Sequence, residues 1–511
     1  MRVRDPFSEY FASIIIGNII GALSIQKRTR LMKQRQTILT VVILLVLSFQ
    51  VLVLVILALF PYAPDPGLSI LNNNIYTFLA PLSTVLLLGL LYAWLIKLGT
   101  REARHYSRRF EKLVQFLIEP FRTLISSVKT RSLSESARSL KILSHPRLLL
   151  AIGLATSVLL ALLPYRADLN PTGGLVGIDS PLYVTWIDQM LGRPFPQALQ
   201  YSFVEGLDGS RPLLLVILYA IASLGVSPTR IIEYLPVLLA PLLSLSTYIF
   251  VRFGQGSPGL AGLTALLTPF SFYLTVGLWG GYYANMLALI FVFLFLTLLL
   301  TFSRSPTAPK YILMLVLSVA IFLTHPWTWI LIVAPCLVFA VSLWRETGHP
   351  IHLKSVTGII VAGIVLDLMK STIFATRTVA ADVATKLPTG GQVASFWTKL
   401  VNGLLYTHSG LLGNWIVLAL GLLAVFALRF KDWFERLVIL WVGIASIPFL
   451  VLDSYNQTRI VYDVPIPVLM STALLFFLPL IGTRNTRWPG IIIILILVLC
   501  ANYALQGIIL L

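Results

Sequence analysis

The chain of 511 residues has very few cysteines and few charged side chains. Its two cysteines, Cys336 and Cys500, both lie in apolar runs, so the sequence offers neither a disulfide framework nor a cysteine-based metal cluster. Only 11% of the residues are charged and 57% are hydrophobic, and the mean hydropathy is +0.88. A soluble protein of this length would need far more polar surface to cover its core. The composition therefore predicts an all-α, polytopic helical membrane protein.

Acidic residues are also scarce, with 20 Asp and Glu against 38 Lys and Arg. In a soluble protein this excess would suggest nucleic-acid binding, but here the basic residues cluster beside apolar runs. We interpret them as topology signals and as contacts for anionic membrane lipids, with no nucleic acid as partner. A cleavable signal peptide is not expected, because the first strongly apolar run begins near Thr37 and is too long for one.

Apolar runs long enough to cross a bilayer predict about 13 membrane spans. The expected spans are residues 38–60, 77–98, 148–164, 230–250, 258–276, 284–303, 311–325, 326–344, 356–374, 411–429, 434–452, 462–481 and 488–510. With this count, five successive later loops place their basic residues on the same side as the basic N-terminus: Arg252, Arg304 with Lys310, Arg345 with Lys354, Lys431 with Arg436, and Arg484 with Arg487. The positive-inside rule then places the N-terminus in the cytoplasm and the C-terminus outside the cell membrane.

This topology divides the chain into three parts. Residues 1–37 form a basic cytoplasmic N-terminal segment, and residues 38–147 form a two-span extension that includes a basic, amphipathic cytoplasmic segment. Residues 148–511 form the transmembrane core. No soluble domain, low-complexity tract or clear short repeat is evident in the sequence.

Residues 311–344 form one apolar run that is too long for a single span. A helix of this length would reach about 51 Å, against a hydrocarbon core of roughly 30 Å. Pro326 permits a tight turn within the run. We therefore expect two short spans joined as a hairpin, with His325 at its external tip.

The longest polar connection, residues 165–229, is predicted to be external and to carry two helices parallel to the membrane. The first, residues 180–191, is expected to have Ser180 as its N-cap and Pro181 at its first position, and its apolar residues recur at spacings of three and four. The second, residues 212–226, has about 15 apolar residues and is marginal for crossing the bilayer. Both helices are expected to lie on the bilayer.

Asp179 stands immediately before the first of these two helices. Gly173, Gly174 and Gly177 precede it and make the connection flexible. The sequence thus presents a carboxylate at the boundary between lipid and water. The alternative is that Asp179 only helps to cap the helix that follows it.

The external ends collect most of the ionisable residues that do not simply flank a span. They are Asp179, Glu205, Asp208, Arg211, Glu233, His325, Asp453, Arg459 and Asp463. Because charges near the hydrocarbon are costly, such a one-sided collection is a functional-site hypothesis. For each residue taken singly, a solvated position in a loop is the alternative.

Six segments occur in an order that resembles a known family. They are GIDSPLYVTWIDQM, RPLLLVILYAI, EYLPVLLAPLLSLSTYIFVRF, TPFSFYLTVGLWGGYYANMLAL, FLTHPWTW and QTRIVYDVPIPVLM. Together with the long external loop and its early aspartate, they resemble the GT-C class of polyprenyl-phosphate-dependent glycosyltransferases, which includes oligosaccharyltransferases and mannosyltransferases. The resemblance covers roughly residues 148–480. It implies a GT-C-like core and the transfer of a hexosyl or pentosyl group from a polyprenyl (dolichyl-type) phosphate to an acceptor on the external face, as in glycosylation of the cell envelope.

The resemblance also implies roles for particular residues. The catalytic aspartate of the first external loop falls on Asp179, which would act on the acceptor hydroxyl or hold a divalent cation such as Mg²⁺ or Mn²⁺. Asn285 stands where an acidic residue is often found, and this departure puts a firmly held metal in doubt. Trp279, Tyr282 and Tyr283 are candidates for stacking on a sugar.

The chemistry of the implied reaction assigns the remaining candidates. A departing lipid phosphate needs charge neutralisation, which suits Arg459 for its bidentate donors and His325 for a proton or a hydrogen bond. A structural hydrogen bond in the hairpin is the alternative for His325, and an interfacial anchor is the alternative for Arg459. Glu205 and Asp208 would bind the acceptor or merely solvate the loop, and solvation is favoured.

Two other functions remain open at this point. A transporter or lipid flippase would place charged residues within its spans, and the candidates nearest to such positions are Asp367 and Lys370 in one late span. A GT-C-shaped protein without activity, serving as a membrane assembly partner, is the other alternative and is kept open by Asn285.

Overall fold

The computed structural model describes residues 145–167, 169–379 and 381, most of 420–449, residues 462–481 and scattered positions between 493 and 508. The predicted N-terminal segment and two-span extension lie outside the described residues, as do the position of Arg459 and most of the last predicted span. Within the described ranges the secondary structure is entirely helical. The all-α prediction is therefore confirmed for this part of the chain.

Between α6 and α15 the helices follow one another with short connections. In chain order they are α5 (Pro146–Leu162), η3 (Leu163–Tyr165), α6 (Ser180–Leu191), α7 (Phe195–Val204), η4 (Gly206–Gly209), α8 (Pro212–Ala222), α9 (Pro228–Gly254), α10 (Pro258–Leu267), η5 (Thr268–Phe270), α11 (Phe272–Gly280), α12 (Tyr283–Arg304), α13 (Ala308–Thr324), α14 (Pro326–Thr347), α15 (Ile351–Phe374), α19 (Trp433–Phe449) and α21 (Ile466–Ile481).

Six of the described helical segments are long and apolar enough to cross a membrane. They are Pro146–Tyr165, Pro228–Gly254, Pro258–Gly280, Tyr283–Arg304, Pro326–Thr347 and Ile351–Phe374. Shorter apolar helices include Pro212–Ala222, Ala308–Thr324 and Ile466–Phe476. The protein is thus a multi-pass helical membrane protein by the length and composition of these helices.

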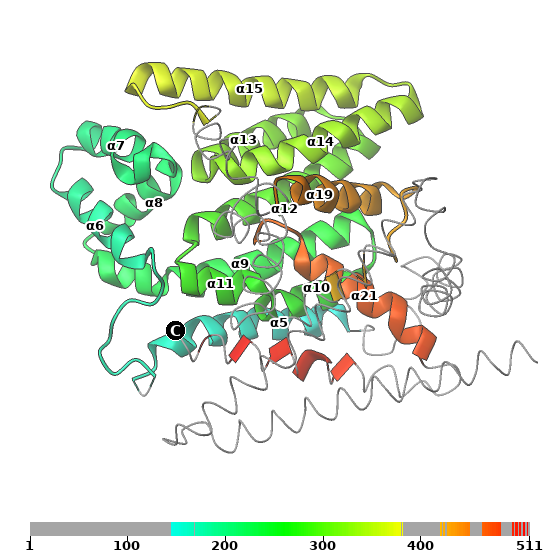
Figure 1. Ribbon diagram of the computed structural model, residues 1–511, viewed down its shortest axis with the longest axis horizontal. Helices are drawn as coiled ribbons and strands as arrows, with labels where there is room; N and C mark the ends of the chain where they lie inside the picture. Colours follow the sequence, from blue (N-terminus) through cyan, green and yellow to red (C-terminus); the bar gives the residue numbers. More distant parts are fainter. Residues whose placement is uncertain are drawn as a thin grey trace, which may run out of the picture.

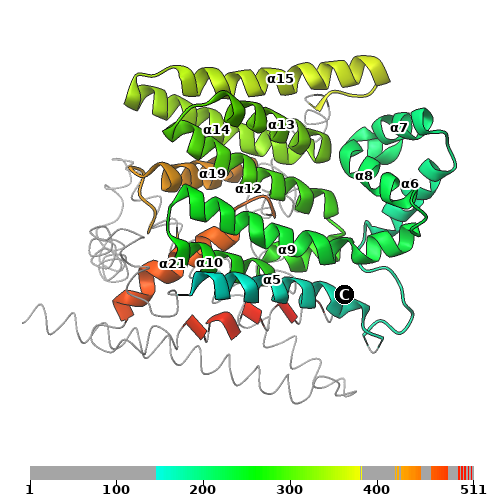
Figure 2. The same cartoon turned by 180° about the vertical axis from the view of Figure 1, so that it is seen from behind.

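The long helices run side by side in layers, from α15 through α13 and α14, then α12 and α9, to α5 (Figures 1 and 2). The three helices α6, α7 and α8 form a small group at one end of this bundle, which we call the end module (residues 180–222). Apolar residues fill the centre of the bundle, and the fully buried aromatic rings include Phe250, Phe293 and Trp441. Their burial against each other holds α9, α12 and α19 together.

The predicted division of the run 311–344 at Pro326 is confirmed, whereas the two helices differ in length, with 17 residues in α13 and 22 in α14. Helix α13 ends at Thr324 and α14 begins at Pro326, with His325 between them in extended backbone. The imidazole of His325 accepts a hydrogen bond from the backbone N–H of Thr328 and so caps α14. The turn lies at the same end of the bundle as α12 begins, because the Asn285 amide approaches the His325 ring.

At the opposite end of the bundle, basic side chains bind acceptor groups near the ends of neighbouring helices. Arg304 donates to the carbonyl oxygens of Phe253, at 2.7 Å, and Gly254. Arg436 pairs with Glu346 at 2.5 Å. Because these residues come from loops that the sequence places on one side of the membrane, their gathering at one end agrees with that arrangement of the chain.

Helix α15 is attached to the end module near its C-terminus. The Lys370 ammonium group donates to the Gly209 carbonyl at 2.7 Å, and the Phe374 ring stacks on Phe203 with 4.7 Å between ring centroids. Lys370 is buried. A charged donor on a buried carbonyl is among the stronger hydrogen bonds of a protein interior.

Replacing Lys370 by Met is expected to loosen the segment that carries Gly209. Backbone amides of residues 203–211 should exchange about tenfold faster with solvent deuterium, because a buried carbonyl loses its charged donor. Hydrogen–deuterium exchange with mass spectrometry measures this. Lys354→Met, at an exposed position near the start of the same helix, is the control. Equal exchange in the two variants would contradict the attachment.

Candidate functional site

The backbone around Asp179 is fixed by the turn between α11 and α12. The N–H of Ile178 donates to the Trp279 carbonyl at 2.9 Å, and the N–H of Asp179 donates to the Gly280 carbonyl at 3.2 Å. These hydrogen bonds join the loop before α6 to a turn about a hundred residues later in the chain. The connection that the glycines were predicted to make flexible is therefore held at two points beside Asp179.

Gly177 makes this close approach possible. Its φ of +101° is a conformation that side chains disfavour, and a Cβ there would lie 2.5 Å from the Leu278 carbonyl oxygen. Only glycine fits both the backbone conformation and the narrow space.

Gly177→Ala is expected to displace Asp179 and to lower thermal stability. The strain of an alanine in this backbone conformation costs about 1–3 kcal/mol, and the collision with Leu278 adds to it. Gly225→Ala is the matched control, because Gly225 has a φ of +91° but no atom within 4 Å of the position that an alanine Cβ would take. Melting of the purified variants in detergent compares them. If the two variants lose the same thermal stability, the close approach at Gly177 does not contribute to stability.

Asp179 does not cap α6 with its side chain. It occupies the position before the helix, but its carboxylate makes no capping hydrogen bond. Ser180, expected as the N-cap, is instead the first residue of the helix. Its hydroxyl donates to the Val176 carbonyl at 2.5 Å and lies 2.8 Å from the Tyr283 hydroxyl. Asp179 thus occupies the N-cap position, and its contribution to the cap comes from the backbone carbonyl, which accepts from the N–H groups of Leu182 and Tyr183.

The Asp179 carboxylate is paired with Arg211. The two groups are 3.5 Å apart, and the exposed fractions of their side chains are 17% for Asp179 and 3% for Arg211. Arg211 also donates to the Tyr183 hydroxyl at 2.6 Å. A nearly buried cation thus holds the carboxylate, which keeps contact with solvent on one side.

Burial and neighbouring charges shift the pKa values of Tyr183 and Arg211. Burial raises the pKa of the Tyr183 phenol, although Arg211 works against that rise. Burial by itself would lower the pKa of Arg211, but Tyr183 and Asp179 raise it above its ordinary value. Arg211 therefore stays cationic and Tyr183 stays neutral at physiological pH.

The candidates on the α11–α12 turn differ in exposure. Trp279 is half-buried, whereas Tyr282, Tyr283 and Asn285 are buried. Tyr282 packs edge-on against Tyr462 with 5.6 Å between ring centroids. The Tyr283 hydroxyl contacts the hydroxyl of Ser180, the residue that follows Asp179. Stacking of these rings on a sugar stays a prediction, and Trp279 is the ring with surface available for it.

His325 belongs to a second buried polar cluster on the other side of that turn. Its Nδ1 atom is 2.8 Å from the Thr328 hydroxyl and 3.5 Å from the Asn285 amide. The Thr328 hydroxyl is also 2.9 and 3.0 Å from the two Asp463 carboxylate oxygens. The structure thus joins residues of α12, α14 and the segment before α21. This arrangement includes the structural hydrogen bond that was the alternative for His325.

The other predicted candidates lie apart or cannot be placed. Glu205 pairs with Arg193 at 3.1 Å, and the exposed fractions of the side chains are 55% for Glu205 and 33% for Arg193. The Arg193 hydrogen bonds lower the pKa of the Glu205 carboxyl, which fits the favoured solvated role. Asp208 lies in η4, but its side chain is outside the described residues, and so is Arg459.

Sequence reasoning misses three residues of these two clusters as site residues. It identifies Arg211 and Asp463 only as ionisable residues at external ends, and it does not single out Thr328. The available signal is the buried-charge argument, since a charged residue between apolar helices needs a partner. A threonine two residues after Pro326 gives no such signal.

The described residues around Asp179 do not make a metal site. Mg²⁺ and Mn²⁺ need several oxygen ligands, whereas Asp179 is one carboxylate beside a guanidinium. Throughout the described ranges, no group of three or more His, Cys, Asp or Glu side chains could hold a metal ion.

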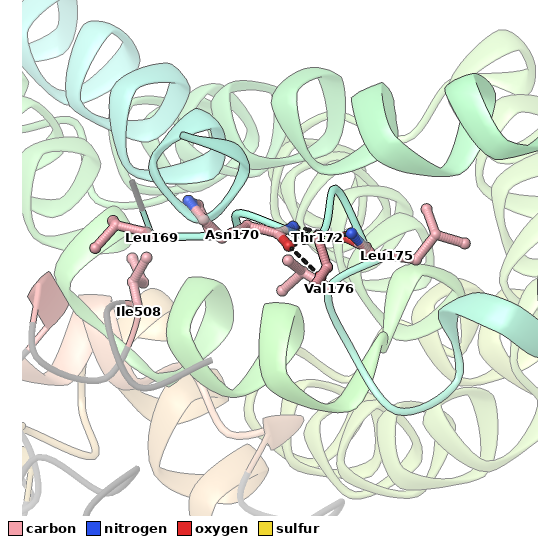
Figure 3. A pocket seen from close by; sticks show the side chains of 8 residues that line it. Leu169, Asn170, Thr172, Leu175, Val176 and Ile508 are labelled. Atoms are coloured by element: carbon pink, nitrogen blue, oxygen red, sulfur yellow. Dashed lines mark hydrogen bonds between the residues drawn. The ribbon is translucent and has the colours of Figure 1, made fainter. Parts of the chain in front are cut away.

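A small cavity of about 220 Å³ lies beside the loop that leads to Asp179. Its lining includes Asn170, Thr172, Val176 and Ile508 (Figure 3). The Asn170 amide donates to the Gly174 carbonyl and accepts from the Gly174 N–H and from Thr172. These contacts shape the loop rather than offer charged groups to a ligand.

No known protein-family model matches this chain, and no curated protein matches it either. A proposed function therefore rests on the residues of the site.

Proposed function

We propose that the protein is a membrane glycosyltransferase that moves a sugar from a polyprenyl phosphate to an acceptor hydroxyl. The observation that carries this proposal is the Asp179–Arg211 pair. It offers a carboxylate that makes no capping hydrogen bond, stands on a backbone held by two hydrogen bonds and is partly exposed. A general base needs this combination of fixed position and access to the acceptor.

The proposed reaction needs a base for the acceptor hydroxyl and positive charge for the leaving phosphate. The bond between the sugar C1 atom and the phosphate oxygen breaks, and a bond forms between C1 and the acceptor oxygen. The acceptor proton goes to Asp179, and the phosphate leaves with the electron pair of the broken bond. His325 and Arg459 are assigned to the leaving phosphate, where positive charge stabilises the transition state.

The proposed setting is a GT-C-like core of about 13 spans in the cell membrane. Residues 1–37 would be cytoplasmic, and the end module would lie on the external face with its helices along the membrane. Anionic lipids would bind at the basic cytoplasmic segments. The support is the separation of the two ends, since Asp179 and His325 lie at the end opposite to Arg304 and Arg436.

The two candidates of the transporter alternative make hydrogen bonds within the protein. Lys370 is bound to the Gly209 carbonyl, and Asp367 accepts a hydrogen bond from the N–H of Val379. Both side chains thus fasten α15 to neighbouring segments, whereas a transport path needs charged groups that exchange ligands. A sugar-transfer experiment distinguishes an active enzyme from an inactive assembly partner.

The test is sugar transfer in reconstituted vesicles with a panel of polyprenyl-phosphate hexoses and pentoses. We expect release of polyprenyl phosphate that depends on an acceptor supplied on the face where Asp179 lies. Binding of donor lipid without transfer across the panel would favour the inactive assembly partner. Movement of labelled lipid between leaflets without transfer would favour the flippase.

A further inference from the structure

The hydroxyl of Thr328 lies between two ionisable side chains. Its oxygen is 2.8 Å from Nδ1 of His325 and 2.9 and 3.0 Å from the oxygens of Asp463. The three residues are buried, with exposed fractions of 0% for Thr328, 1% for Asp463 and 4% for His325. A threonine hydroxyl has a single proton to donate, so it can fully satisfy only one of these two neighbours.

The carboxylate is the stronger acceptor, because hydrogen bonds to ionised groups are about twice as strong as neutral ones. When the hydroxyl donates to Asp463, its contact with His325 requires a proton on Nδ1. The same nitrogen accepts from the backbone N–H of Thr328 at 3.2 Å when it is bare, so protonation of Nδ1 gives up this cap of α14 in exchange for a hydrogen bond to the hydroxyl. The charge of Asp463 therefore determines, through the Thr328 hydroxyl, whether Nδ1 of His325 carries a proton.

We propose that Asp463 is a positioning residue for His325: acting through Thr328, it holds a proton on Nδ1 and stabilises the imidazolium form of the ring. This inference rests on the proposed function, in which His325 meets the donor phosphate. An imidazolium presents a positive charge together with its Nε2–H to a leaving phosphate, whereas a neutral ring brings no charge.

Three described neighbours of this cluster carry no charge at physiological pH. Asn285 of α12 is neutral, and its amide is 3.5 Å from Nδ1. The phenols of Tyr273 and Tyr462 lie near Asp463, and phenols are uncharged at physiological pH. Asp463 is thus the anion that these contacts bring to His325.

Deuterium exchange at the C2 position of histidine tests the proposal without any sugar donor. The exchange rate changes with imidazole protonation, and mass spectrometry of the peptide that contains His325 gives the pH of half-change. Thr328→Val keeps the side-chain shape and removes the hydroxyl, whereas Thr328→Ser keeps the hydroxyl. We expect the half-change pH of His325 to fall by about one unit in Thr328→Val and in Asp463→Asn, and to stay at the wild-type value in Thr328→Ser.

His349, exposed at the opposite end of the bundle, is the internal control and should not shift in any variant. An unchanged half-change pH of His325 in folded Thr328→Val or Asp463→Asn would overturn the proposal. A shift in Thr328→Ser equal to that in Thr328→Val would also overturn it, because the hydroxyl would then be irrelevant. The result does not depend on transfer activity, so a failed sugar assay leaves this test intact.

If the protein transfers sugar, the same variants give a second readout. Transfer by Thr328→Val should decline at a lower pH than transfer by the wild type, because His325 loses its proton sooner as the pH rises. Thr328→Ser should follow the wild-type profile. A uniform loss at all pH values in Thr328→Val would indicate a structural role only and would count against the proposal.

Discussion

Asp179→Asn is expected to lower the rate of sugar transfer by at least about 100-fold while the donor lipid still binds. The amide keeps the shape of the side chain and a carbonyl oxygen that can accept from Arg211. It cannot take the proton of the acceptor hydroxyl. Transfer rates and donor binding are measured separately in reconstituted vesicles, so that loss of chemistry is distinguished from loss of binding.

Asp188→Asn is the matched control for this substitution. Asp188 lies on the same helix, α6, and is exposed. The substitution changes the charge by the same amount without touching the Asp179–Arg211 pair. Transfer by Asp179→Asn at the wild-type rate would show that another group removes the proton.

Arg211→Met is expected to lower the free energy of unfolding by about 3 kcal/mol, near the lower end for a broken buried ion pair. The loss leaves Asp179 without its cation and the Tyr183 hydroxyl without its donor. Solvent contact at Asp179 moderates the effect. Denaturant or thermal unfolding in detergent measures the change.

Arg193→Met provides the comparison, because the Arg193–Glu205 pair is solvated and such pairs contribute little. The double variant Asp179→Asn with Arg211→Met should be more stable than the sum of the two single changes predicts, since it leaves no unpaired charge. Additive losses would show that the two side chains do not interact.

Local features of the sequence predicted much of the helical framework. The run around Pro326 is too long for one span, and the structure divides it between Thr324 and Pro326. The helix after Asp179 begins where Pro181 suits the first turn. Such features depend on hydrophobic length, periodicity and turn residues, which neighbouring positions of the chain already specify.

The candidate site was predictable only in part. The sequence singled out Asp179 and His325 as ionisable residues at the ends of apolar helices. It did not pair Asp179 with Arg211 or connect His325 to Asp463. Thr328 and Asp463 are 135 positions apart in the chain, and no local pattern relates them.

The sequence by itself determined that this is a helical membrane protein and where most of its described helices begin and end. Composition and periodicity are enough for this, because burial of apolar length in a bilayer acts on each helix separately. Only the tertiary structure decided which carboxylate meets Arg211 and which residue stands between His325 and Asp463. Hydrogen bonds and ion pairs act over a few ångströms, so their partners are chosen by how the helices pack.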